Sequence, residues 1–164
     1  MGDAMLHASE AGEAEEYFNT ALEHRLRANI NDANKAQAHR NHLFKTAIAA
    51  MIAEDSATAA AKTAEYTAAV KANGTAFEAR RAHELAGYLA MTDDDMAAGA
   101  EHLAQGSQFN PVVLYWSAVA QNALGNKETA IALATRAANR NTLSPDLPFA
   151  RADALALLEE LNAS

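Results

Sequence analysis

Three consecutive carboxylates, Asp93, Asp94 and Asp95, stand beside a run of small residues in the stretch "TDDDMAAGA" (92–100). Clustered carboxylates can hold a divalent cation or carry out acid–base chemistry. A calcium-binding loop of the EF-hand type needs a glutamate at its twelfth position, where a loop that starts at Asp93 has Ala104 instead. Aspartate also caps the start of a helix and complements the helix dipole. We therefore predict that the triplet marks the turn between two helices.

A second candidate for chemistry is the histidine pair of "AHRNHLF" (38–44), in which His39 and His42 stand three positions apart. Residues at this spacing share one face of a helix, and two imidazoles can share a zinc or nickel ion. No carboxylate or third histidine follows at a matching spacing, and the H-E-x-x-H pattern is absent. We favour partly packed or exposed histidines and no metal site. A metal-binding or hydrolytic helical domain that uses this pair is kept as an alternative, which elemental analysis would distinguish.

The remaining patterns of catalytic proteins are missing. The chain has no cysteine, which excludes thiolate catalysis, disulfides and cysteine-based zinc sites. Neither the G-x-S-x-G pattern of a nucleophilic serine nor a glycine-rich phosphate loop occurs. The sequence therefore predicts a protein that is not an enzyme, with no catalytic residues and no cofactor.

The charge of the chain argues against a nucleic-acid or anionic-membrane partner. The formal net charge is −8 and the pI is near 5.1, whereas nucleic acids and anionic membranes attract clustered lysine and arginine. The first residues lack the basic and apolar regions of a signal peptide, and the longest apolar run, "TAIAAMIA", is too short to cross a bilayer. We expect no nucleic-acid partner, no membrane partner and a cytoplasmic location.

Helices must position all of these residues. The chain is rich in alanine, which is the best helix former, and its apolar residues recur with helical spacing nearly throughout. Breaks at "NIND", "EDS", "NGT", the aspartate triplet, "NP" and "GN" separate about eight helices, with Ser9, Thr75 and Asn110 as caps. The predicted helices cover 9–28, 33–53, 57–71, 76–91, 95–108, 111–124, 126–140 and 149–161. Such short connections make consecutive helices antiparallel neighbours.

An internal repeat appears when Asp94 is aligned with Gly125. Small residues then coincide in both helices of each hairpin. The pairs are Gly87 with Ala118, Gly99 with Ala130, and Gly106 with Ala137. Antiparallel helices approach closely only where their contact points carry small side chains. The repeat therefore predicts a tight helix hairpin that occurs more than once.

These residues resemble the tetratricopeptide repeat, a helix-hairpin motif of about 34 residues. One copy has His83, Gly87, Asp94, Gly99, Leu103, Gly106 and Pro111 at the motif positions, and the next has Leu114, Ala118, Gly125, Ala130, Ala134, Ala137 and Thr142. A degenerate earlier copy has Phe44, Ile48, Asp55, Ala60, Ala64 and Thr67. The two better copies are 31 residues apart, so their connection is shorter than the family pattern.

The resemblance implies an all-α fold, a right-handed solenoid of about eight antiparallel helices in a single helical-repeat domain over 1–164. Its parts would be an acidic N-terminal segment with helices (1–40), a degenerate repeat (41–79), two repeats (80–110 and 111–142) and a C-terminal capping helix (144–162). A short solenoid with an alanine-rich core is also a candidate for self-assembly, because terminal repeats expose one face. A homodimer is therefore a second alternative, which sedimentation would test.

In this family the first helix of each hairpin lines a concave groove that binds a peptide or helix of a partner protein. Carried over position by position, the groove would contain Arg81, Glu84, Tyr88, Met91, Tyr115, Val119 and Asn122, with His42 and Lys45 from the degenerate copy. Tyr88, Tyr115 and Arg81 are the expected anchors, because tyrosine and arginine dominate binding energies. Alternatively, these side chains pack against the N-terminal helices or a second subunit.

Overall fold

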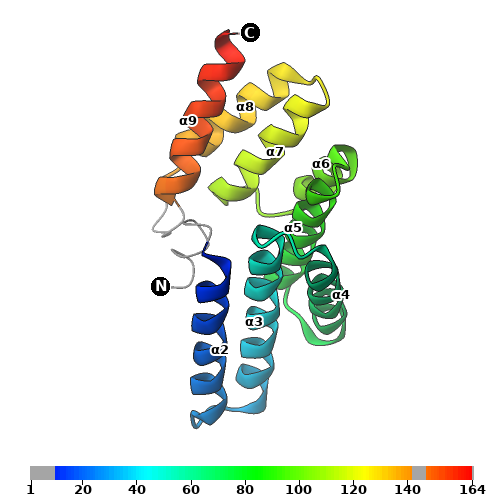
Figure 1. The fold of residues 1–164 in the computed structure, drawn as a ribbon, viewed down its shortest axis with the longest axis vertical. Coiled ribbons are helices and arrows are strands. Elements are labelled where there is room, and N and C mark those ends of the chain that lie inside the picture. Colours follow the sequence, from blue (N-terminus) through cyan, green and yellow to red (C-terminus); the bar gives the residue numbers. More distant parts are fainter. Residues whose placement is uncertain (1–9, 142–146, 164) are drawn as a thin grey trace. The chain divides into compact units, whose positions relative to one another are not determined.

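The computed structural model describes residues 10–141 and 147–163, and the elements in these ranges are all α-helices (Figure 1). They are α2 (Ala11–Arg27), α3 (Asp32–Ile52), α4 (Ser56–Asn73), α5 (Ala76–Thr92), α6 (Met96–Gln105), α7 (Pro111–Ala123), α8 (Lys127–Ala138) and α9 (Leu147–Ala163). The all-α prediction is confirmed, and every predicted helix end lies within three residues of the observed one. The predicted cap Ser9 and most of the connection before α9 lie outside the described residues.

The chain forms two compact units that meet in sequence between Leu85 and Ala86, within α5. The first unit contains α2, α3, α4 and the first part of α5. The second contains the rest of α5 and α6 to α9. Each unit has its own core.

The core of the first unit is built around two aromatic rings. Phe44 of α3 and Tyr66 of α4 pack edge to face with ring centroids 5.6 Å apart, and Val70 and Leu85 complete the buried cluster. Helix α2 runs beside α3 (Figure 1) and packs through Ala14 and the half-buried Phe18. Large buried side chains therefore hold α3, α4 and α5 together in this unit.

A buried ion pair joins α3 to α5 in the same unit. Arg40 Nε donates to Glu78 Oε1 at 2.8 Å, and both residues are less than 8% exposed. Glu78 also accepts from the backbone N–H of Thr75 at 2.9 Å, while the Thr75 hydroxyl accepts from the backbone N–H of Glu78 at 3.2 Å. This reciprocal arrangement is a capping box, so the predicted cap at Thr75 is confirmed. The Tyr66 hydroxyl donates to the Glu78 carbonyl at 3.3 Å.

The second unit packs α7, α8 and α9 through small side chains. Its buried positions include Ala118, Ala120, Ala130, Ala134, Ala137, Ala138, Ala150 and Ala154, with Leu114, Leu157 and Leu161 between them. Helix axes approach closely where the contact residues are this small. Further along, α5 and α6 meet at Gly87 and Gly99, where an added Cβ would lie 2.7 Å from Leu103 Cγ and 2.6 Å from Met91 Cγ respectively. These two positions therefore have no room for a Cβ, and only glycine fits there without a shift of the facing side chain.

Three helix hairpins turn with the same backbone geometry. The turning residue adopts a left-handed conformation in each, with φ of 57° at Glu54, 60° at Asp94 and 78° at Gly125. In each turn this residue donates to the carbonyl three positions earlier, and the next residue donates to the carbonyl five positions earlier. These are the two hydrogen bonds of a Schellman motif. The structure therefore contains the same helix end three times, at α3, α5 and α7.

The aspartate triplet lies in the second of these turns, as the sequence predicts. Asp94 takes the left-handed conformation, and the Asp95 side chain accepts from the backbone N–H of Ala98 at 3.0 Å, which caps α6. Asp55 caps α4 in the same way through Thr58, and hydrogen bonding to the side chain and the backbone N–H of Thr58 lowers the pKa of the Asp55 carboxyl. The triplet therefore forms the turn between α5 and α6 and caps the start of α6.

The register of the degenerate first copy requires a correction. The left-handed residue there is Glu54 and the cap is Asp55, whereas the sequence alignment matched Asp55 to the left-handed Asp94. The copy therefore begins one residue earlier. The expected contact positions Ala60, Ala64 and Thr67 are exposed, and the preceding residues Ala59, Thr63 and Tyr66 are buried. Because Glu54 and Asp55 are adjacent and both acidic, the sequence alone does not show which of them takes the left-handed position.

Candidate partner-binding site

Arg81, one of the expected anchors, lies between two aromatic rings on the surface of the first unit. Its guanidinium carbon is 3.5 Å from the ring centroid of Phe44 and 5.5 Å from that of Phe77. Its Nη1 donates to Asn41 Oδ1 at 3.1 Å. Stacking on two rings together with a hydrogen bond holds the guanidinium in one orientation. We call Asn41, Phe77 and Arg81 the α3–α5 surface.

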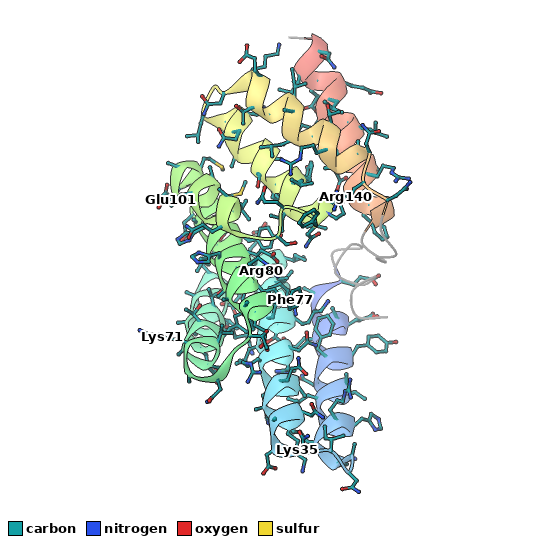
Figure 2. All side chains as sticks on the ribbon, turned by 180° about the vertical axis from the view of Figure 1, so that it is seen from behind. Lys35, Lys71, Phe77, Arg80, Glu101 and Arg140 are labelled. Atoms are coloured by element: carbon teal, nitrogen blue, oxygen red, sulfur yellow. The ribbon has the colours of Figure 1, made fainter. Side chains whose placement is uncertain are left out.

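Phe77 supplies the exposed apolar part of this surface, at the start of α5 (Figure 2). Its side chain is 55% exposed, which is the largest value for an aromatic residue of the first unit. Sequence reasoning missed it because it falls outside the family's groove positions. A signal was present, since Phe77 and Arg81 are four residues apart and therefore share one face of the helix.

His42 and Lys45, expected in the groove, face helix α2 instead. His42 Nε2 is 2.7 Å from Asn19 Oδ1, and Lys45 Nζ lies 5.9 Å from the ring centroid of Phe18. Burial, with the nearby positive charge of Lys62, lowers the pKa of His42 and so favours its neutral imidazole. The physical reason for the difference is the one-residue shift of the first copy, which moves both side chains onto the face that α2 covers.

Glu84 and Met91 are closed to solvent, which differs from the expectation that they line an open groove. Glu84 is 3% exposed and Met91 is 9% exposed. Met91 belongs to the cluster of the second unit that includes Leu103 and Val113, and Tyr88 packs against this cluster while half-buried. Met91 is buried because Gly99 leaves space for it on the facing helix. Of these positions only Tyr88 keeps part of its side chain at the surface.

Tyr115 packs against α9 in the second unit, together with Leu158. Burial raises the pKa of its hydroxyl, and the acidic side chains of Asp153 and Glu160 on α9 add to this effect. Val119 is half-buried between two apolar clusters, and Asn122 is exposed. Tyr115 therefore packs inside the second unit against the C-terminal helix α9, and within the described residues the clusters it contacts contain no residue of the N-terminal helices.

A cleft of about 570 Å³ lies between α2, α3 and α4 and includes the histidine pair of the metal alternative. Its polar lining contains His39, His42 and Glu65, and the negative charges of Glu15 and Glu65 counteract part of the lowering of the His42 pKa. Within 10–141 and 147–163, no three histidine, aspartate or glutamate side chains come together as a metal site. The two imidazoles thus have no third ligand in the described part of the chain.

Compared with known proteins, the chain matches no family model, no curated protein and no solved structure. Among the described helices, none combines the length and the apolar character that crossing a bilayer requires. The likeness to tetratricopeptide repeats therefore rests on the residue pattern and on the three hairpins with a common turn.

Proposed function

We propose that the chain is a protein-interaction module without catalytic activity, whose hairpins α3–α4, α5–α6 and α7–α8 are tetratricopeptide-like repeats of a right-handed solenoid capped by α9. The support is the turn that recurs at Glu54, Asp94 and Gly125 with the same hydrogen bonds. Small buried residues follow each turn at equal distances, at Ala59, Gly99 and Ala130. A repeated hairpin of this kind serves to present side chains to a partner.

The observation that carries the proposal is the α3–α5 surface, with Phe77 exposed beside Arg81. An aromatic ring offers a partner apolar area, and a positioned guanidinium binds a carboxylate or carbonyl oxygen with little further loss of entropy. Side chains of these two types dominate the binding energy of interfaces. We propose that a partner peptide or helix places an apolar side chain on Phe77 and an acceptor group near Arg81.

The proposal is tested by isolating partners with the wild-type chain and with a Phe77→Ala/Arg81→Gln variant, and by measuring the affinity of each recovered partner by calorimetry. We expect the double variant to weaken binding by at least about tenfold, because truncated anchors typically cost more than about 1–2 kcal/mol. Tyr17→Ala is the matched control, since Tyr17 is 41% exposed on α2 of the same unit. Unchanged affinity in the double variant would refute the proposed surface.

The pair Tyr88 and Tyr115, which the sequence favours as anchors, is a weaker choice for this test. Both side chains pack against buried clusters of the second unit. Their alanine variants would remove core contacts as well as any partner contact. Phe77 is exposed, so its substitution separates binding from folding.

A further inference from the structure

Three arginines of the second unit gather where the connection from α6 to α7 passes the end of α8. Arg136 Nη2 donates to the carbonyl of Gln108 at 3.3 Å, and Arg140 Nε donates to the carbonyl of Phe109 at 3.1 Å. Arg151 Nη2 donates to the carbonyl of Arg140 at 2.7 Å, and its Nε donates to that of Ala138 at 3.0 Å. We call Arg136, Arg140, Arg151 and Phe109 the arginine corner; Figure 2 labels Arg140 in it.

This corner collects most of the positive charge of an acidic unit. Residues 86–164 contain nine acidic and four basic side chains, and three of the four basic ones belong to the arginine corner. Each of the three is held by backbone carbonyls. In the part of the second unit that the structure describes, none has a carboxylate within ion-pair distance. Within the described residues these positive charges therefore have no countercharge, although acidic residues outnumber basic ones in the unit.

The guanidinium groups keep hydrogen-bonding capacity for a ligand. A guanidinium has five N–H donors, and Arg136 and Arg140 each make one hydrogen bond within the described residues. Arg136 is exposed and Arg140 is half-exposed. Because a carbonyl bond orients each group, and the Phe109 ring also contacts that of Arg140, little side-chain entropy remains to be lost when a ligand binds.

An exposed aromatic ring completes the corner. The guanidinium carbon of Arg140 lies 4.8 Å from the ring centroid of Phe109, and this ring is 71% exposed, the highest value among the large apolar side chains of the described chain. One face of the ring thus packs on a cation while much of the remainder meets water. Such an arrangement suits an apolar side chain that is flanked by carboxylates.

We propose that the arginine corner binds a short acidic peptide segment of a partner protein, with two carboxylates on Arg136 and Arg140 and an adjacent apolar side chain on Phe109. Complementary charge supports this choice of ligand, since carboxylates pair with guanidinium groups in a bidentate manner. A long nucleic acid fits less well, because acidic side chains outnumber basic ones in residues 86–164 as a whole and repel an extended polyanion. This surface belongs to the second unit and uses none of the residues of the α3–α5 surface.

The test measures binding of a fluorescein-labelled peptide, Gly-Glu-Glu-Leu-Glu-Glu-Gly with blocked ends, to the full chain by fluorescence anisotropy. We expect Arg136→Gln to weaken binding about threefold, as for a solvent-accessible ion pair, and Arg136→Gln/Arg140→Gln about tenfold. Phe109→Ala should weaken it to a similar extent as Arg136→Gln. Raising the ionic strength should weaken wild-type binding, because added salt screens exposed charges.

Lys127→Gln is the matched control, because it removes the remaining basic side chain of the second unit away from the corner. Its affinity should stay within about twofold of wild type, and circular dichroism should show each variant to be folded. Arg136→Gln remains informative if the Arg140 variant fails to fold, since Arg136 is exposed. Equal loss in Lys127→Gln, no loss in Arg136→Gln, or equal binding of a single-stranded oligonucleotide of the same charge would overturn the proposal.

Discussion

The two units differ in how they use buried polar groups. Within the described residues, the buried charged side chains are Arg40, Glu78 and Glu84, and all three belong to the first unit. Among the described residues of the second unit, Ser117 is the one buried polar side chain, and its hydroxyl donates to the carbonyl of Val113 at 2.7 Å. The first unit therefore combines a charged pair with large aromatic rings, whereas the second depends on close packing of small apolar residues.

This difference shows two ways to specify how helices meet. In the first unit, the ion pair of Arg40 and Glu78 is satisfied only when α3 and α5 are in one register, because a shifted register would leave a buried charge without a partner. In the second unit, Gly87 and Gly99 allow only the register that places Leu103 and Met91 beside them. Charge complementarity selects the register in one case, and steric fit selects it in the other.

The largest expected effect comes from breaking the ion pair with Arg40→Met. Removing one partner leaves Glu78 buried and unpaired, which typically costs about 3–5 kcal/mol. Far-UV circular dichroism in guanidinium chloride would follow the whole chain, and fluorescence of Trp116 would follow the second unit. We expect the dichroism transition to move to lower denaturant while the fluorescence transition moves less. If the dichroism and fluorescence transitions shift by the same amount, the two units do not unfold independently, which would contradict the expectation.

The same pair makes the stability of the first unit depend on pH. Burial alone would raise the pKa of Glu78, but hydrogen bonds from Arg40 and Thr75 outweigh it and lower the pKa. The unfolded state therefore binds a proton at higher pH than the folded state. The contribution of Glu78 is complete above the unfolded pKa and is lost as pH falls through the folded pKa. In Glu78→Gln, the stability of the first unit should depend less on pH in this acidic range.

A smaller change in stability is expected when alanine replaces glycine. Its sign should differ between a position that has no room for a Cβ and a position that has room. Gly87→Ala should destabilise the second unit by about 1–3 kcal/mol, because an added Cβ would lie 2.7 Å from Leu103 Cγ and 3.2 Å from the carbonyl oxygen of Gly99. In Gly12→Ala the added Cβ has no atom within 4 Å, so the better helix propensity of alanine should stabilise α2 by about 0.5–1 kcal/mol. Thermal unfolding of the two variants provides the comparison. If the Gly87→Ala variant is more stable than the wild type, α5 and α6 can move apart to accept the added methyl group at little cost.

Local signals made most of the fold predictable, and tertiary contacts explain what was missed. The helix ends at Thr75, Asp95 and Asn110 follow from capping chemistry that involves only a few neighbouring residues. The candidate site depends on which helix covers which face. The sequence does not show that α2 covers His42, or that Arg81 stacks on the ring of Phe44, because these contacts join residues more than twenty positions apart.

The three hairpin turns allow the smallest and most specific comparison between the units. The same left-handed conformation occurs at Glu54 in the first unit and at Asp94 and Gly125 in the second. A side chain with a Cβ is strained in this region, and aspartate tolerates it better than glutamate. Glu54→Gly should therefore stabilise its turn by about 0.5–1 kcal/mol, Asp94→Gly by less, and Gly125→Ala should destabilise by about 1 kcal/mol. Chemical denaturation would rank the variants, with Glu54→Gln as the control that removes the charge and keeps the strain. If Glu54→Gly and Glu54→Gln are equally stable, backbone strain at this turn does not lower the stability of the first unit.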